Sequence, residues 1–411
     1  MPPAVEQHPM PSRGAIPMMA LACGVMVANV YLCQPLLSQI AQGLRVSAPT
    51  AGWVATAAQI GYAIGILFVV PLADRADPRR LVRCLLALSC IALICAGLSP
   101  SAHLLAILTF VVTTVTVVPQ VLIPVAVSTA PPGKSGRVLG TMQTGLIMGI
   151  LLSRTVSGAV GQFSGSWRAP YFLAATLTAV LFLVLPAFIP ERAVAAPSAG
   201  APAAPRQSYL GLLKSLPLLL LTWRDLRFSA LLGASMFGAF SAFWATLAFH
   251  LAQPPFGFGP AQAGLFGLWG AAGALAAPYC GRLSDKLGAT VVNMISLSCA
   301  VVAFAAFMFA GDVSVWAIVL GVNFLDFANQ SGQIANQARI FKLDPGARAR
   351  LNTVYMVFTF GGGALGSALG AWAWSLHAWR GVCTAGFALL AVVAVLLLAR
   401  RLMGTPKSTP Q

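Results

Sequence analysis

One acidic residue lies deep inside an apolar run, where an ionisable side chain carries a large desolvation cost. Asp326 stands in the run Val313–Ala338, about 20 Å from its start at 1.5 Å per helical residue. A charge at that depth in hydrocarbon costs about 2.5–3.5 kcal/mol. A carboxyl group there could bind a proton from one side of a membrane and release it to the other. The alternatives are that it caps a broken turn or pairs statically with Arg154.

A stripe of polar side chains accompanies Asp326. Asn323, Gln330, Gln333 and Gln337 share its register at spacings of three and four, which places all five on one helical face. Amides facing lipid would lack partners, so we expect the stripe to face protein or a watery cavity. Three other apolar runs contribute candidate cavity residues, namely Asn29, Gln34, Thr113, Thr116, Gln120, Ser241 and Trp244. For these residues, hydrogen bonding between helices is an equal alternative.

Arg154 is the one arginine or lysine deep inside an apolar run. It could balance Asp326, attract an anionic substrate group, or donate to carbonyls at a helix end. The eight cysteines lie in or beside apolar runs without CxxC spacing, so we expect neither a metal site nor a cofactor. No phosphate-binding glycine loop and no nucleophile–base pair is present, so the sequence predicts neither an ATP-driven pump nor an enzyme.

The elements that position these residues are predicted to be membrane-spanning helices. The chain is 58% hydrophobic and 8% charged, with a mean hydropathy of +0.83, whereas a soluble domain carries about 25% charged residues. Twelve runs are long enough to cross a bilayer. They are Ala15–Leu37, Thr50–Ala73, Leu81–Leu98, His103–Val127, Val138–Phe163, Pro170–Ile189, Phe228–Leu251, Ala261–Gly281, Ala289–Ala310, Val313–Ala338, Leu351–Ser375 and Gly381–Ala399.

The net charge of +16 does not indicate nucleic-acid binding, because its distribution follows the runs. Most basic residues lie before the first run, after the last, or in the loops that follow even-numbered runs. The opposite loops hold Arg45, Arg168 and Arg380. This bias predicts that both termini are cytoplasmic in a multi-pass inner (plasma) membrane protein.

Three loop signatures recur about 210 residues apart, which predicts two copies of one helical bundle in tandem. Leu72–Arg75 recurs as Leu283–Lys286, Arg137 ahead of a glycine-rich run recurs as Arg350, and Trp167-Arg168 recurs as Trp379-Arg380. We therefore expect one six-helix bundle over 1–190, a cytoplasmic linker over 191–227 and a second bundle over 228–411. Within the linker, Ser208–Trp223 is leucine-rich and interrupted by Lys214, so it reads as an interfacial helix on the cytoplasmic leaflet, with a partial extra span as the alternative.

These loops resemble a signature of the major facilitator superfamily, and the resemblance covers essentially the whole chain. The second copy, Gly281–Gly288, reads GRLSDKLG and keeps both glycines of the signature. The first copy keeps the residues Leu72, Asp74, Arg75, Arg79 and Arg80. The stretches Asn29–Leu37 and Gln59–Gly65 resemble a bacterial branch of drug or sugar efflux permeases. Arg154 stands where the antiporter pattern of the fifth helix has proline, so the resemblance by itself does not assign proton-driven export.

The resemblance implies an all-α fold of twelve transmembrane helices in two pseudo-symmetric bundles, with alternating access to a site between them. We expect a secondary active transporter that exports a small amphipathic compound or drug against proton entry through Asp326. The alternatives are a proton symporter or facilitator for an organic anion, and a transporter-like membrane sensor or scaffold. The expected partners are a small-molecule substrate, H⁺ and membrane lipid, with no nucleic acid, and the expected state is a monomer. The expected gating residues are Asp74, Arg75, Arg79, Asp285, Lys286, Gly361, Gly362 and Gly366.

Overall fold

The computed structural model describes residues 14–131, 134–189, 208–273, 286–344 and 346–402. Within these ranges the regular structure is helical throughout. The helices of the first half are α1 (Ala15–Tyr31), α2 (Leu37–Leu44), α3 (Ala48–Ile64), α4 (Pro78–Gly97), α5 (Ala102–Val115), α6 (Val118–Ser128), α7 (Ser135–Phe163) and α8 (Ala169–Val184). Those of the second half are α9 (Tyr209–Thr222), α10 (Arg224–Leu251), α11 (Pro260–Trp269), α13 (Ala289–Ala310), α14 (Val315–Ile340) and α15 (Arg348–Leu402).

The expected membrane character of these helices is confirmed. In the described part of the chain, 9 helical stretches are long and apolar enough to cross a membrane. The longest, α15, changes direction at His377 and Ala378, whose torsions are not helical, so it holds the two runs predicted there. Helix α14 has 26 residues but carries the polar stripe, and the eighth predicted run is described only as far as residue 273. The count of twelve spans therefore stays a prediction.

Local sequence explains where many of the helices begin. The side chains of Ser47, Asp77, Ser101 and Ser314 each accept a hydrogen bond from the backbone NH three residues later, as N-cap residues do. Proline occupies the first turn of α3, α4, α8 and α11, where its missing NH costs nothing. The predicted helix over Ser208–Trp223 forms as α9, capped by Ser208.

Several predicted continuous helices are interrupted, two of them beside prolines. The run His103–Val127 divides into α5 and α6 at Thr116 and Val117, just before Pro119. The first run breaks after α1 and re-forms through a short 3₁₀ turn, Gln34–Leu36, before α2. Proline supplies no NH to the ladder and clashes with the preceding turn, which accounts for both breaks. The break after α1 places Gln34 beside Arg154 of α7.

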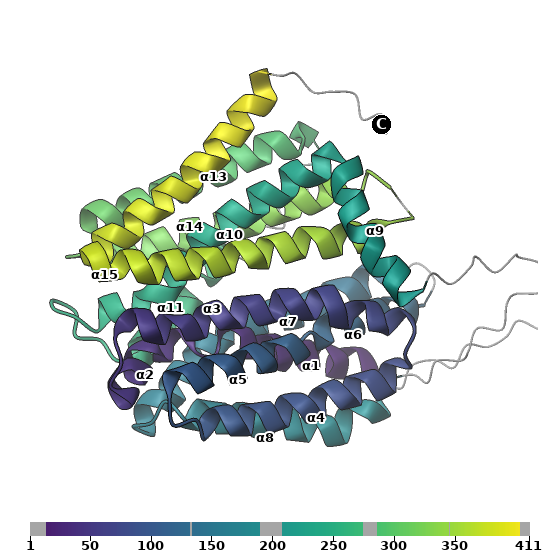
Figure 1. The fold of residues 1–411 in the computed structure, drawn as a ribbon, viewed down its shortest axis with the longest axis horizontal. Coiled ribbons are helices and arrows are strands. Elements are labelled where there is room, and N and C mark those ends of the chain that lie inside the picture. The colour runs from purple at the N-terminus through teal and green to yellow at the C-terminus, as the bar shows by residue number, and fades with distance from the viewer. Residues whose placement is uncertain (1–13, 132–133, 190–207, 274–285, 345, 403–411) are drawn as a thin grey trace, which may run out of the picture.

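The two halves of the chain pack against each other along two helix pairs. In Figure 1 the helices α10, α13, α14 and α15 lie above the helices of the first half, and the contacts between halves run chiefly through α7 with α11 and through α3 with α15. The end of α7 is tightly packed, since a Cβ on Gly158 would meet the backbone of Pro260. Near its start, a Cβ on Gly136 or Gly140 would meet nothing within 4 Å. Helices α7 and α11 thus hold the halves together at one end.

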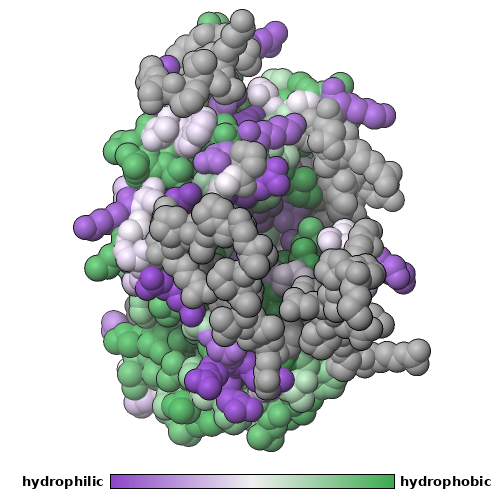
Figure 2. Space-filling view, turned by 90° about the vertical axis from the view of Figure 1, so that its right-hand side faces the viewer, coloured by the Kyte–Doolittle hydropathy of each residue, from purple (hydrophilic) through white to green (hydrophobic). Residues whose placement is uncertain are grey.

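The opposite end carries α9 and much of the polar surface. Helix α9 descends from the upper layer in Figure 1, and the hydroxyl of Tyr209 donates to the carbonyl of Phe68 at 2.9 Å. Figure 2 views this end, where hydrophilic side chains are spread between hydrophobic flanks. Exposed arginines at helix termini, such as Arg80 of α4 and Arg137 of α7, belong to this polar surface. The position of the flanks agrees with a lipid-facing belt.

Candidate functional site

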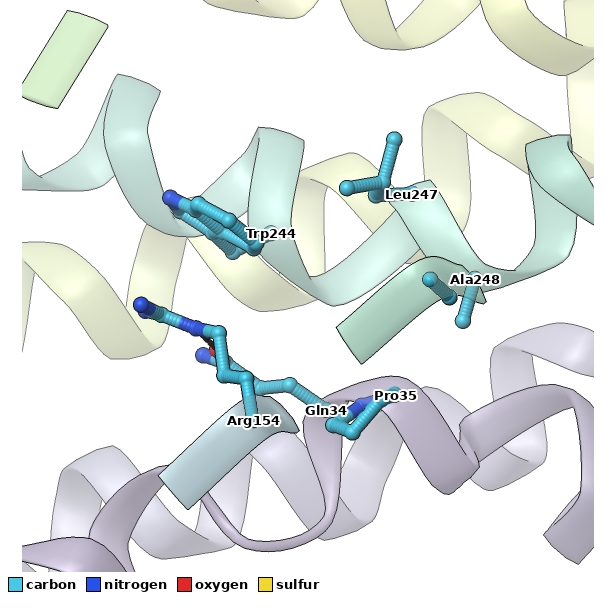
Figure 3. Close-up of a pocket in the computed structure, with 7 residues that line it drawn as sticks. Gln34, Pro35, Arg154, Trp244, Leu247 and Ala248 are labelled. Carbon is cyan, nitrogen blue, oxygen red and sulfur yellow. Dashed lines mark hydrogen bonds between the residues drawn. The ribbon is translucent and has the colours of Figure 1, made fainter. Parts of the chain in front are cut away.

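Arg154 of α7 is enclosed by aromatic rings where the two halves meet. Its side chain is 2% exposed, and its guanidinium carbon lies 3.8 Å from the ring centre of Trp244 and 4.8 Å from that of Tyr31. Figure 3 shows the guanidinium below the indole of Trp244, next to Gln34 from the break after α1. Its Nε donates to Gln34 Oε1 at 2.7 Å. A planar guanidinium suits this stacked and hydrogen-bonded position, whereas a lysine ammonium would not.

One nitrogen of Arg154 is left without a partner. Its Nη2 is buried and makes no hydrogen bond within the described structure. A small cavity is lined by Arg154 together with Gln34, Pro35, Trp244, Leu247, Ala248 and Ala263, most of which are labelled in Figure 3. An unpaired buried donor on a charged group is expensive. The site is therefore suited to a ligand with an acceptor group and an apolar body.

Asp326 of α14 is buried in the same region and is also incompletely paired. Its side chain is 5% exposed, and Oδ2 has no hydrogen-bond partner in the described ranges. It interacts electrostatically with Arg154. The described side chains show no ion pair between the two within 4.0 Å. The carboxyl group packs on Gly270, where an added Cβ would overlap Oδ2.

Four of the predicted cavity residues are paired with protein groups. Asn29 Nδ2 donates to Thr116 Oγ1 at 3.2 Å, and that hydroxyl donates to the carbonyl of Met26 at 2.7 Å. Thr113 bonds to carbonyls of its own helix. Asn323 donates to its own helix and accepts from the NH of Gly273 at 3.2 Å. The contacts of Asn29, Thr116 and Asn323 join different helical segments, so they support the structural alternative for these three residues, whereas the bonds of Thr113 stay within α5.

The remaining predicted residues are less completely paired. Gln120 donates to the hydroxyl of Tyr62 at a long 3.4 Å. Ser241 Oγ and Trp244 Nε1 are buried without partners among the described groups. Gln330 is half-buried. Gln333 lines a second small cavity inside the second half, with Asn329, Asn336, Tyr355 and Thr359 among its walls.

Several site residues were not predicted from sequence. Tyr31 covers one side of Arg154, and Gly270 receives the carboxyl group of Asp326. Gln59 Oε1 and Ser367 Oγ are buried without partners in the part of the chain described. An aromatic or a glycine in an apolar helix carries no signal of its own. The spacing of glycines by three on the eighth predicted run was the available clue to Gly270.

The structure describes some of the predicted gating residues. Gly362 and Gly366 face the backbone of α10 at Ala234 and Gly238, whereas a Cβ on Gly361 would meet nothing within 4 Å. Arg75 and Lys286 are exposed, and Arg79 Nε donates to the carbonyl of Ile189 at 3.2 Å. Asp285 and the side chain of Asp74 lie outside the described residues. The gating role of this set stays a prediction.

Comparisons with known proteins agree on one family. The model of the Major Facilitator Superfamily matches residues 19–338. The putative uncharacterized transporter YgaY of Escherichia coli (strain K12) is 38% identical over 386 residues, which cover 94% of this chain and 95% of YgaY. The probable transporter SCO4007 of Streptomyces coelicolor is 36% identical over 93% of this chain and 88% of its own. The solved structure of the nucleoside transporter NupG superposes with a TM-score of 0.70 at 16% identity, covering 96% of this chain and 100% of NupG.

Proposed function

The chain belongs to the major facilitator superfamily of membrane transporters, and we propose that it is a secondary active transporter that exports a small amphipathic compound in exchange for protons. It is a transporter and not an enzyme. The observation that carries the proposal is the pair Arg154 and Asp326. These residues come from opposite halves of the chain and are both buried, and each has a polar atom without a partner among the described residues. Unpaired ionisable groups inside a membrane protein mark substrate and proton pathways.

Asp326 would carry the coupling proton. A buried carboxylate is costly unless it is paired or neutral, and the observed Asp326 has no ion pair within the described structure. Binding a proton would remove this cost in one conformation. Opening of the site to the other side would hydrate the carboxyl group and release the proton. Alternating access would then couple proton entry to substrate movement.

The charge pattern predicts that α9 and the basic helix termini lie on the cytoplasmic side. On that assignment, α7 and α11 pack together at the extracytoplasmic end, around Gly158 and Pro260. The start of α7, around Gly136 and Gly140, lies on the cytoplasmic side with open space beside it. This arrangement supports a conformation that is closed to the outside. Movement of α7 against α11 would then expose the site outward.

A second candidate function is supported by one feature of the same site. Arg154 has an Nη2 without a partner among the described groups, and the same residue lines a cavity whose other walls include Pro35, Leu247 and Ala248. That arrangement suits a carboxylate or other anionic group attached to an apolar body. The transporter would then be a proton symporter or facilitator for an organic anion. The two candidates differ in direction of transport and in the charge of the substrate.

Transport by the Asp326→Asn variant tests the proposal. A compound that raises the melting temperature of the purified protein first identifies a substrate. Proteoliposomes then measure its accumulation under an imposed pH gradient. The amide mimics a permanently protonated acid, so gradient-driven accumulation should be lost while substrate binding survives. Asp344→Asn is the matched control, because its acid accepts from the NH of Gly346 in a loop and an amide oxygen keeps that bond. Accumulation by the Asp326→Asn protein at the normal rate would refute proton coupling through this residue.

A further inference from the structure

Helix α11 and its continuation carry four glycines at a spacing of three: Gly264, Gly267, Gly270 and Gly273. Residues three apart lie on the same side of a helix. Successive glycines are therefore neighbours in a strip of bare backbone, the glycine face, which drifts around the helix by about 60° per step; the strip runs past the end of α11, where Gly270 is the C-cap residue. Each glycine lies against a residue of another helix at a distance that leaves little or no room for a Cβ. The two charged residues of the site are among those neighbours.

The first two glycines, Gly264 and Gly267, pack against α7. A Cβ on Gly264 would overlap the carbonyl of Arg154, and one on Gly267 would lie 3.2 Å from Arg154 Cβ and 3.5 Å from its Cδ. The hydroxyl of Thr155 donates to the carbonyl of Gly264 at 3.1 Å. Arg154 thus rests on this face with both its backbone and its side-chain stem.

The other two glycines, Gly270 and Gly273, pack against α14. A Cβ on Gly270 would overlap Oδ2 of Asp326 and lie 3.0 Å from its Cγ. One on Gly273 would overlap the carbonyl of Asn323, and the NH of Gly273 donates to Asn323 Oδ1. The unpaired oxygen of Asp326 therefore points at Gly270. The contact points of the two charges lie one step apart on α11, about 4.5 Å along its axis.

We propose that Gly270 is a positioning residue for Asp326, and that the glycine face of α11 sets the location of its carboxyl group relative to Arg154. This inference rests on the proposed function of Asp326 as the proton carrier. A side chain at position 270 would push the carboxyl group off α11 and change its environment. Sliding of α7 along the same face would move Arg154 relative to Asp326, so α11 would link the conformation of the first half to the state of the acid.

Gly270 differs from the other three glycines in what a methyl group would meet. At Gly264 and Gly273 the obstacle is backbone, which cannot yield without separating the helices. At Gly270 the nearest atom is the end of a flexible side chain, followed by Val322 Cγ1 at 3.0 Å. A carboxyl group can rotate away at modest cost. Gly270→Ala should therefore fold, with its carboxyl group displaced.

The groups that act electrostatically on Asp326 come from two helices. They are Arg154 of α7 and Tyr31 of α1. Displacement of the carboxyl group changes its distance from both and its access to water. The protonation equilibrium of Asp326 is thus the quantity that a positioning role of Gly270 should change.

Infrared spectroscopy of the purified protein measures the protonation of Asp326 and needs no substrate. The carboxyl stretch of Asp326 is assigned by its absence in Asp326→Asn and is followed from pH 4 to pH 10. Gly270→Ala should move the titration midpoint by about one pH unit or more, which corresponds to about 1.4 kcal/mol. Asp326→Glu, which relocates the carboxyl group by one methylene and leaves α11 untouched, should also move it. Gly136→Ala is the matched control, because its Cβ would meet nothing within 4 Å.

The outcomes separate this inference from the proposed function. A folded Gly270→Ala protein whose band titrates like that of the unaltered protein would overturn the positioning role, even if Asp326→Asn abolishes coupled transport. A shifted band together with normal transport by Asp326→Asn would support the positioning role and refute proton coupling. If Gly270→Ala does not fold, the test rests on Asp326→Glu. A carboxyl band of Asp326→Glu with the same titration midpoint as that of the unaltered protein would then overturn the inference.

Discussion

Arg154 and Asp326 are buried in one region and come from opposite halves of the chain, yet no ion pair within 4.0 Å joins them in the described structure. A buried charge that loses its partner costs about 3–5 kcal/mol. A protein that needed only stability would bring these side chains together or replace both with apolar residues. Their separation leaves Nη2 and Oδ2 free for a ligand and a proton. This arrangement supports the proposal that the site binds a substrate and a proton.

Arg154→Lys should weaken the binding of an anionic substrate by at least about tenfold, or 1.4 kcal/mol. Lysine keeps the charge but loses the planar stack on Trp244 and the Nε bond to Gln34. Titration of the purified protein with the substrate measures the affinity. Arg168→Lys is the matched control, since Arg168 also stacks on an indole, that of Trp167, at 4.2 Å, away from the site. Equal affinity for the Arg154→Lys and unaltered proteins would exclude Arg154 as an anchor.

Thr116→Val should lower stability and leave the substrate KM unchanged. The hydroxyl of Thr116 links Asn29 and the carbonyl of Met26, so its loss removes two bonds between helices. The expected cost is about 0.5–1.5 kcal/mol. Thr113→Val is the comparison, because its hydroxyl bonds only to carbonyls of α5 and should cost less. Thermal unfolding in detergent and transport kinetics measure the two effects. A raised KM with normal stability would instead place Thr116 in contact with substrate.

Gly362→Ala and Gly366→Ala should each destabilise the protein by about 1–3 kcal/mol through overpacking. Their methyl groups would overlap the backbone of Ala234 and Gly238 in α10. Gly361→Ala should be neutral or slightly stabilising, because space is open there. The melting temperature in detergent tests the contrast. A Gly361→Ala protein of normal stability that transports slowly would show that α15 needs this space in another conformation. Equal melting temperatures for all three would contradict the packing argument.

Reporter fusions should locate the linker and both termini in the cytoplasm. A reporter placed after Gln411 or within 193–205 is expected inside, and one within 253–260 is expected outside. The basis is the clustering of basic residues in alternate loops. Detection of the linker outside the cell would overturn both the topology and the assignment of α9 to the cytoplasmic leaflet.

Much of the fold could be predicted from the sequence because it depends on local composition. Transfer into hydrocarbon decides which segments span a membrane, and most of the predicted runs appear as helices within a few residues of their expected limits. The same principle singled out Arg154 and Asp326, since an ionisable group in an apolar run is conspicuous whatever its surroundings. The breaks at Gln34 and Thr116 were less visible, because proline within a membrane helix is often tolerated.

The pairing of individual atoms was decided by the tertiary structure. Asn29, Thr116 and Asn323 have the same chemical types as Ser241 and Gln59, yet the first three find partners and the last two do not. Helix rotation and close approach at glycines determine that difference. They depend on residues more than a hundred positions apart, such as Arg154 and Gly267. The sequence by itself determined that this chain is a membrane protein with two buried charges. Only the packing of α7, α11 and α14 decided that the two charged side chains lie in one region, with Nη2 of Arg154 and Oδ2 of Asp326 left without partners in the described structure.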